Sequence, residues 1–413
     1  MTAVAEPRPD LLRGLRYLSG RALPFVLWVT VFFGAFAFIE PSPYEFGFLV
    51  LCVFAALRGM PIPPVLIVPT LLLALFNIGG MASLAEIDSD FIQVRFIAIS
   101  AYLAVTVIIL ALVVAENPDR MEIIASAYIA AALVAASAGI AGYFDVAGTF
   151  DLFTENSRAR GTFKDPNVMG PFLILPAILI AQRILTGTAR QAVLSLCLLG
   201  IVMIAILLSF SRGAWGHTVV SFALFGWLLF STSQTAGARA RIVFSTIGAL
   251  LAAVALLAAL LSVPKVQELF EVRFKLVQYY DGGEMGRFGK QRLAIPDLMK
   301  HPNGYGPMEF RHSFGEDPHN VYVNAFASYG WLGGFTYAAF IASTLMAGAA
   351  GALRRTPFQH YAIATFSTFS VLTLLGLVID TDHWRHFYLL SGLVWGLYAA
   401  GLRYRAPPEA IAS

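Results

Sequence analysis

Residues 92–115 read IQVRFIAISAYLAVTVIILALVVA, and this stretch decides the class of protein. It contains one charged residue, Arg95, and it exceeds the roughly 20 apolar residues that a helix needs to cross a bilayer. A helix of this composition is apolar on every side, so it has no face to turn toward water. We therefore predict that the stretch spans a membrane.

Eleven further apolar stretches extend the same pattern along the chain. The second of the twelve is short, and the tenth is long and contains Gly330, Gly333 and Gly334, where we expect it to bend. The sequence predicts an all-α, polytopic membrane bundle of about twelve transmembrane helices. The eleven lie near residues 22–39, 44–57, 61–78, 121–144, 167–185, 191–208, 214–230, 242–263, 320–351, 359–379 and 386–402.

Composition agrees with this class. Of 413 residues, 58% are hydrophobic and only 13% are charged, about half the roughly 25% of a soluble domain. A soluble enzyme and a disordered chain are excluded, and the runs are too long and continuous for a β-barrel. A net charge of +3 gives no reason to expect nucleic-acid binding. Cys52 and Cys197 lie in apolar runs, so we interpret both as buried, free thiols.

Arginines set the predicted orientation through the positive-inside rule. Four arginines precede the first span, which places the N-terminus in the cytoplasm. Twelve alternating spans then return the C-terminus to the same side. The acidic residues Glu86, Asp88 and Asp90 then fall on the outer, periplasmic side. Inner segments receive Arg8, Arg13, Arg16, Arg21, Arg58, Arg120, Arg183, Arg190, Arg239, Arg241, Arg354, Arg355, Arg403 and Arg405.

One integrated membrane domain is expected, in three parts. Residues 1–263 hold the first nine spans, residues 264–319 form a long periplasmic loop with short helices, and residues 320–413 hold the last three spans. A loop of this length is far above the usual connection length, which is typical of functional or disordered loops. Its Gly turns, aromatic residues and a helical pattern at 290–300 favour an ordered loop.

Basic residues of the outer side concentrate in three segments. Residues 157–170 read SRARGTFKDPNVMG, the turn around 209–216 reads SFSRGAWG, and Arg287 opens the amphipathic stretch of the long loop. Each has a structural interpretation as a capped turn, an interfacial arginine or a solvated face. Each also fits an anion site, since helix N-termini and arginines attract phosphate. The candidate ligands are Arg158, Arg160, Lys164, Ser211, Arg212, Arg287, Lys290 and Arg292.

His319 stands directly before the tenth span, between Pro318 and Asn320. It is either a hydrogen-bonded residue at a helix start or a general base at the membrane surface, because histidine titrates near neutral pH. A second polar group lies at 379-IDTDHWRHF-387. Its side chains could ligate a metal, but the spacing is more typical of a charged turn. The candidates there are Asp380, Asp382, His383 and His386.

Four motifs in this order resemble the O-antigen ligase/polymerase family. They are RGTF followed by Pro166-Asn167, Ser-Arg-Gly at 211–213, Arg287 followed by HP-x-G-x-G at 301–306, and Pro-His-Asn at 318–320. The likeness covers roughly residues 155–335. It departs at Gln291, where the family often has an aromatic residue four positions after the loop arginine.

The resemblance implies a membrane glycosyltransferase of the bacterial inner membrane, with an active site at the periplasmic face. It would move a glycan from an undecaprenyl-diphosphate carrier to a glycan or lipid A-core acceptor, with inversion and without metal or cofactor. Arg212 and Arg287 match the phosphate-binding arginines and His319 the catalytic histidine. Arg160, Lys164, Arg292, Ser211 and Asn320 are further candidates for substrate binding.

Three alternatives remain at this point. A polymerase that joins lipid-linked repeat units for surface or exopolysaccharide synthesis has the same motifs. A flippase or transporter suits twelve spans, although the long loop lies between the ninth and tenth spans, where a two-fold repeat would place it centrally. A metal-dependent transferase would use Asp380 and Asp382. The sequence does not indicate the acceptor, the sugars, the linkage or the oligomeric state.

Overall fold

The computed structural model describes residues 11–38, 41–88, 90–274, 283 and 286–404. Helices fill most of this part of the chain, and its two strands, β1 (Thr154–Glu155) and β2 (Arg158–Ala159), form one small antiparallel hairpin that pairs Thr154 with Ala159. The all-α prediction is therefore confirmed. The long helices are α1 (Leu11–Phe33), α2 (Pro43–Arg58), α3 (Ile67–Ser83), α4 (Phe91–Glu116), α5 (Arg120–Tyr143), α8 (Ile174–Thr186), α9 (Ala189–Leu208), α10 (Arg212–Thr232), α11 (Ala236–Leu261), α15 (Val321–Leu353), α16 (Gln359–Leu375) and α17 (Arg385–Arg403).

Every predicted apolar stretch overlaps one of these helices. Eight helical segments of the described chain are long and apolar enough to cross a membrane: those of α3, α4, α5, α7 with α8, α9, α10, α11 and α15. The polytopic class is thus supported, while the count of twelve spans stays a prediction. Short helices connect the long ones: η1 (Pro64–Leu66), η2 (Leu84–Glu86), η3 (Val146–Gly148), α6 (Phe150–Phe153), α7 (Pro166–Phe172), α12 (Pro264–Arg273), α13 (Arg287–Leu298) and α14 (Phe310–Phe314).

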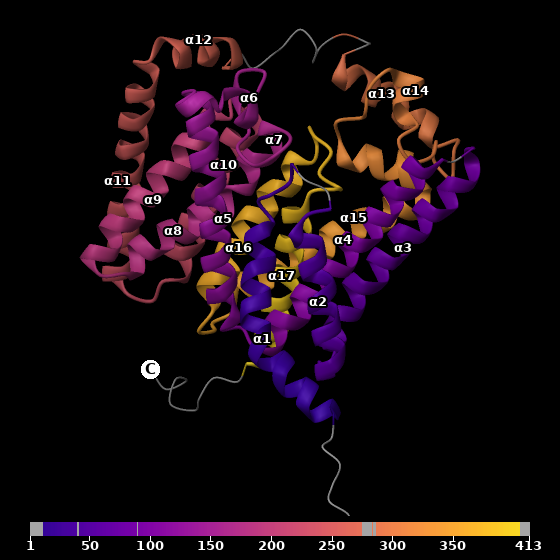
Figure 1. Ribbon diagram of the computed structural model, residues 1–413, viewed down its shortest axis with the longest axis horizontal. Coiled ribbons are helices and arrows are strands. Elements are labelled where there is room, and N and C mark those ends of the chain that lie inside the picture. Colours follow the sequence, from indigo (N-terminus) through magenta and orange to yellow (C-terminus); the bar gives the residue numbers. More distant parts are fainter. Residues whose placement is uncertain (1–10, 39–40, 89, 275–282, 284–285, 405–413) are drawn as a thin grey trace, which may run out of the picture.

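The short helices α6, α12, α13 and α14 gather at one end of the bundle, at the top of Figure 1, and α1 begins at the opposite end. We call the first of these the loop end. That the long loop and the N-terminus lie on opposite sides of a membrane stays a prediction. Three short helices lie within the described parts of the long loop, and the predicted helix at 290–300 corresponds to α13.

Close helix pairs form the core of the bundle. α15 packs along α3, and a Cβ atom on Gly79 would lie 2.5 Å from the carbonyl oxygen of Tyr329. α17 packs along α4 in the same way, since a Cβ atom on Gly392 would lie 2.8 Å from the carbonyl oxygen of Val107. Small residues let helix backbones approach where the surrounding lipid offers no hydrophobic driving force.

α15 bends at Gly330, as the sequence predicts. Gly330 has φ 66° and ψ −171°, a conformation that strains any residue with a side chain. The bend frees backbone groups, and the turn after α13 binds them: Trp331 N–H donates to Pro302 O at 2.7 Å, and Tyr305 N–H donates to Ala327 O at 2.8 Å. The HP-x-G-x-G turn therefore anchors the long loop to the bent helix.

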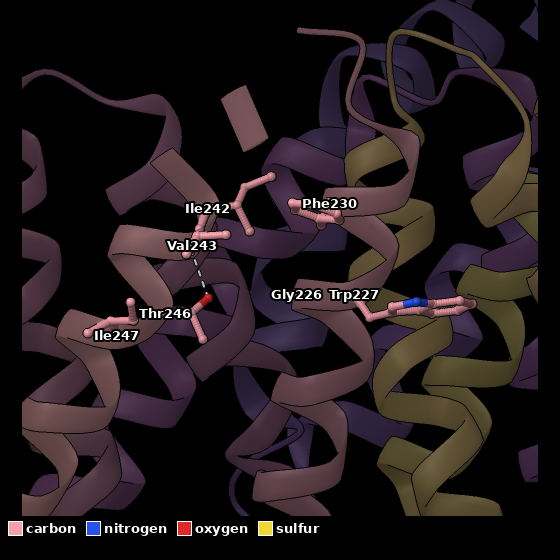
Figure 2. A pocket seen from close by; sticks show the side chains of 7 residues that line it. All are labelled: Gly226, Trp227, Phe230, Ile242, Val243, Thr246 and Ile247. Atoms are coloured by element: carbon pink, nitrogen blue, oxygen red, sulfur yellow. Dashed lines mark hydrogen bonds between the residues drawn. The ribbon is translucent and has the colours of Figure 1, made fainter. Parts of the chain in front are cut away.

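α11 stands at the edge of the bundle, and none of its residues is buried (Figure 1). An apolar groove separates it from α10, and no predicted site residue lines it. Figure 2 shows its lining: Gly226, Trp227, Phe230, Ile242, Val243, Thr246 and Ile247. The same outward exposure corrects the prediction for the cysteines, because Cys197 on α9 is exposed and Cys52 only half-buried, although both are free. Apolar helix faces in a membrane protein need not turn inward, since lipid is as apolar as the core.

Candidate functional site at the loop end

The segment 376–380, directly after α16, is where the main candidate residues converge. Val321 N–H donates to Gly376 O at 2.8 Å, and the Arg287 guanidinium donates to Val378 O at 3.4 Å. α10 begins beside it, because a Cβ atom on Gly213 would lie 2.6 Å from Leu375 Cδ1. Residues at the starts of α10, α13 and α15 therefore all contact the end of α16 or the segment after it, although 75 residues separate the first two starts in sequence.

Asp380 holds the backbone at His319. Its Oδ2 accepts from His319 N–H and its Oδ1 from Asn320 N–H, both at 3.0 Å. His319 has φ 49°, a left-handed conformation that is uncommon for non-glycine residues and costs about 1–2 kcal/mol. Asn320 caps α15 by accepting from the N–H groups of Tyr322 and Val323. The cap and the carboxylate together fix the turn that presents His319.

The His319 side chain is half-buried, and among the described residues its ring takes part in no hydrogen bond. Burial lowers its pKa below the usual 6.5, and the nearby Arg287 guanidinium lowers the pKa further. The ring is therefore neutral at neutral pH, which is the form that accepts a proton. The structure thus leaves a basic nitrogen available beside an arginine.

The surroundings of Asp380 raise the pKa of its carboxyl group, whereas those of His319 lower the pKa of its ring. Burial raises its pKa to about 7, the Asp382 carboxylate adds to the rise, and the N–H donors of Asn320 and His319 oppose it. Asp382 itself binds elsewhere: it accepts from Asn324 Nδ2 at 3.1 Å and lies 3.1 Å from His383 Nδ1. No group of three His, Cys, Asp or Glu side chains within the described residues is arranged to hold a metal ion.

Ser211 and Arg212 occupy the start of α10. Ser211 is buried, and its hydroxyl caps the helix by accepting from Ala214 N–H at 3.3 Å. Arg212 is the first helical residue and is half-buried. Phe210, just before the cap, has φ 46°. The tight turn thus places a cation at a helix N-terminus, where the free N–H groups and the helix dipole also favour an anion.

The segment 157–167 reaches the same turn through Arg158. Arg158 is 7% exposed, and its guanidinium donates to Ser209 O and to Asn167 Oδ1, both at 2.8 Å. Arg160 instead donates to backbone carbonyls of α6, at Asp151 and Leu152. The sequence placed both arginines in one anion site. Alternation along a strand does not distinguish the two arginines, because residues two positions apart point to the same face. They differ because Arg160 lies beyond the end of β2 at Ala159.

Two of the remaining three predicted ligands, Lys164 and Arg292, are exposed. Lys164 lies before α7, and Arg292 lies on α13. Lys290 pairs with Glu316 at 2.9 Å. The residue that sequence reasoning noted only as a departure from the family pattern, Gln291, is buried and contacts the His319 turn. Its place on the inward face of α13 is the signal that could have revealed it.

Comparison with known families bears on the same region. The family model described as O-Antigen ligase matches residues 194–338. This region of the chain is similar to the O-antigen ligase family. The match runs from within α9 into α15, and so includes Arg212, Arg287 and His319. No curated protein matches the chain. Together with the apolar helices, the family match indicates a multi-pass membrane protein with a glycosyltransferase-like function.

Proposed function

We propose that the protein transfers a glycan from an undecaprenyl-diphosphate carrier to a sugar hydroxyl of an acceptor at the periplasmic face of the inner membrane. In this proposal both termini are cytoplasmic and the loop end is periplasmic. The observation that carries it is the arrangement around 376–380, which sets a neutral His319 beside Arg287 and close to the start of α10. An anion site next to a base is what this transfer requires.

The chemistry follows from the charges. His319 takes the proton of the acceptor hydroxyl as its oxygen attacks the anomeric carbon. The bond from that carbon to the phosphate oxygen breaks, and the diphosphate leaves with the electron pair. Arg212 and Arg287 stabilise the charge that develops on the leaving group, since guanidinium forks bind phosphate oxygens well. Attack opposite the leaving group inverts the anomeric centre, and no metal or cofactor is needed.

Other side chains contribute to donor binding in this proposal. Ser211 and Asn320 cap the two helices that face the donor. Arg160, Lys164 and Arg292 supply positive charge around the site. Lys164 and Arg292 are exposed, so solvent screens their charges. Replacing either should lower the rate of glycan transfer less than replacing Arg212 or Arg287.

The test uses the purified full chain with an undecaprenyl-diphosphate-linked glycan. The proposal predicts transfer that persists in EDTA and an inverted linkage in the product. Loss of transfer in EDTA, or full activity of the folded variant His319→Ala, would overturn it. Transfer of label across sealed vesicles without a new glycosidic bond would indicate a transporter.

The acceptor separates ligase from polymerase. Incubation with a lipid A-core acceptor yields a ligation product, whereas a second lipid-linked glycan yields a longer carrier-linked chain. Both products come from the same donor-side chemistry, so the arginines and His319 have the same roles in either case.

A further inference from the structure

α13 turns one face toward α15. Gln291, Ala294 and Leu298 are the buried residues of this helix, at positions i, i+3 and i+7. Ala294 and Leu298 belong to a small separate core with Phe310, Val323 and Ala327. Gln291 thus occupies a position where an apolar side chain would be expected, and a buried amide without hydrogen bonds is costly there.

The amide of Gln291 is bonded on both sides to the His319 turn. Its Nε2 donates to Pro318 O at 2.8 Å and, more weakly, to His319 O at 3.5 Å. Its Oε1 accepts from Asn320 Nδ2 at 3.3 Å. One side chain therefore contacts three consecutive residues centred on His319, all of them outside its own helix.

Gln291 also follows Arg287 by four residues on α13. In a helix this spacing places the two side chains one turn apart on the same face. A contact that fixes Gln291 against the turn therefore also constrains where the backbone of Arg287 lies relative to His319.

We propose that Gln291 is a positioning residue that holds the His319 turn against α13 and so sets the distance between His319 and Arg287. This inference rests on the proposed transferase function and adds a residue to it. Gln291 touches neither substrate in this scheme. It acts through the backbone of the base and through the helix that carries a phosphate-binding arginine.

The charged groups around His319 shift the pKa of its ring. Burial lowers the pKa of His319 most, and Arg287 and Lys290 lower it further. The carboxylates of Glu316 and Asp317 raise it. If the contact of Gln291 is lost, α13 moves more freely, and both the burial of His319 and the influence of its two cations decrease. The pKa of His319 then rises toward its usual value. The groups that face His319 are Arg287, Lys290, Glu316, Asp317 and Asp380.

The experiment compares wild type with Gln291→Met, which keeps the length of the side chain but removes its donor and acceptor. We expect kcat to fall about 10- to 100-fold, the cost of a small misplacement of a catalytic group. The KM for the lipid-linked donor should change far less. Because the base works in its neutral form, a higher pKa of His319 moves the acidic limb of the pH profile of kcat/KM to higher pH.

Gln267→Met is the matched control. Gln267 belongs to the same loop, but it is exposed and its amide donates to Glu271 within α12. This variant should keep the wild-type rate and pH profile. If Gln291→Met does not fold, Gln291→Asn retains a buried amide that is one methylene too short to reach, and it should move both readouts in the same direction.

Two results would overturn the inference. One is a folded Gln291 variant with a wild-type rate. The other is a reduced kcat with an unmoved acidic limb, which would assign Gln291 a structural role only. Both differ from failure of the proposed function, in which wild type itself transfers no glycan or His319→Ala remains fully active.

Discussion

Arg158 and His319 both lie at the loop end, and the fold uses them in different ways. The Arg158 guanidinium is buried and donates to Ser209 O and Asn167 Oδ1, so its side chain binds the scaffold. At His319 the scaffold binds the backbone instead, through Asp380, and within the described residues the ring makes no hydrogen bond. The first arrangement stabilises a corner, whereas the second positions a side chain and leaves it available for chemistry.

A position in a basic segment does not by itself define the role of a residue. Arg158 and Arg160 lie two residues apart in a basic segment, yet the more buried of them donates to the end of α9 and the start of α7. His319 precedes α15, a helix without charged residues. Burial and the nearby Arg287 lower the pKa of His319 and so favour its neutral ring. Four predictions test this division, from the largest expected effect to the smallest.

The largest effect is expected at His319. His319→Ala should reduce glycan transfer about 10²- to 10⁴-fold, because it removes the base while the backbone contacts to Asp380 can persist. Initial rates with saturating donor and acceptor measure this effect. His312→Ala is the control, since the His312 side chain is 71% exposed on α14 and pairs with Glu309. Equal losses in both variants would show that the loop as a whole is sensitive and His319 is not special.

Arg212 and Arg287 should come next. Replacing either by alanine should cost about 10²- to 10³-fold in kcat, the usual effect of removing one group that stabilises developing charge. Lysine variants should recover part of this rate, since they keep the charge but lose the guanidinium fork. Rates measured across donor concentrations distinguish the chemical step from binding. If the alanine variants changed only KM, the arginines would bind the carrier without stabilising the leaving group.

Replacing Arg158 should reduce the stability of the fold more than the rate of glycan transfer. Arg158→Met leaves Ser209 O and Asn167 Oδ1 without their donor, which should cost about 2–4 kcal/mol of folding free energy. Thermal unfolding of the purified protein in detergent measures the loss, and transfer per folded molecule should stay close to wild type. An unchanged unfolding temperature together with a large loss of transfer would place Arg158 in the anion site after all.

The smallest effect is a displacement of the pH profile. Burial and the Arg287 guanidinium lower the pKa of His319, so the ring stays neutral, and active as a base, to a lower pH than an ordinary histidine. The acidic limb of kcat/KM should therefore have its midpoint below 6.5 in wild type. Arg287→Gln should move it upward. A wild-type midpoint above 6.5 would contradict the neutral-base interpretation.

Much of the fold could be predicted because its signal is local. Each long apolar stretch overlaps a helix, the bend at Gly330 follows from a glycine-rich stretch in the tenth span, and the helix at 287–298 follows from its pattern. Arg212, Arg287 and His319 were predicted as site residues because each lies in a short motif. The exposed face of α9, with Cys197, was predicted wrongly because an apolar residue can face lipid or protein.

The remaining site residues could not be assigned from sequence because their roles depend on contacts between distant segments. Asp380 suggested a metal ligand or a charged turn, yet it binds the backbone of His319, 61 residues earlier. Gln291 is a polar residue within a helix, and only the packing of α13 on α15 directs its amide to the same turn.

The sequence by itself determined an all-α membrane protein and predicted a site with a histidine and arginines, because hydrophobicity and short motifs are properties of the chain alone. Only the tertiary structure decided which polar side chains hold the scaffold and which remain available, because a hydrogen bond forms between groups that folding brings together.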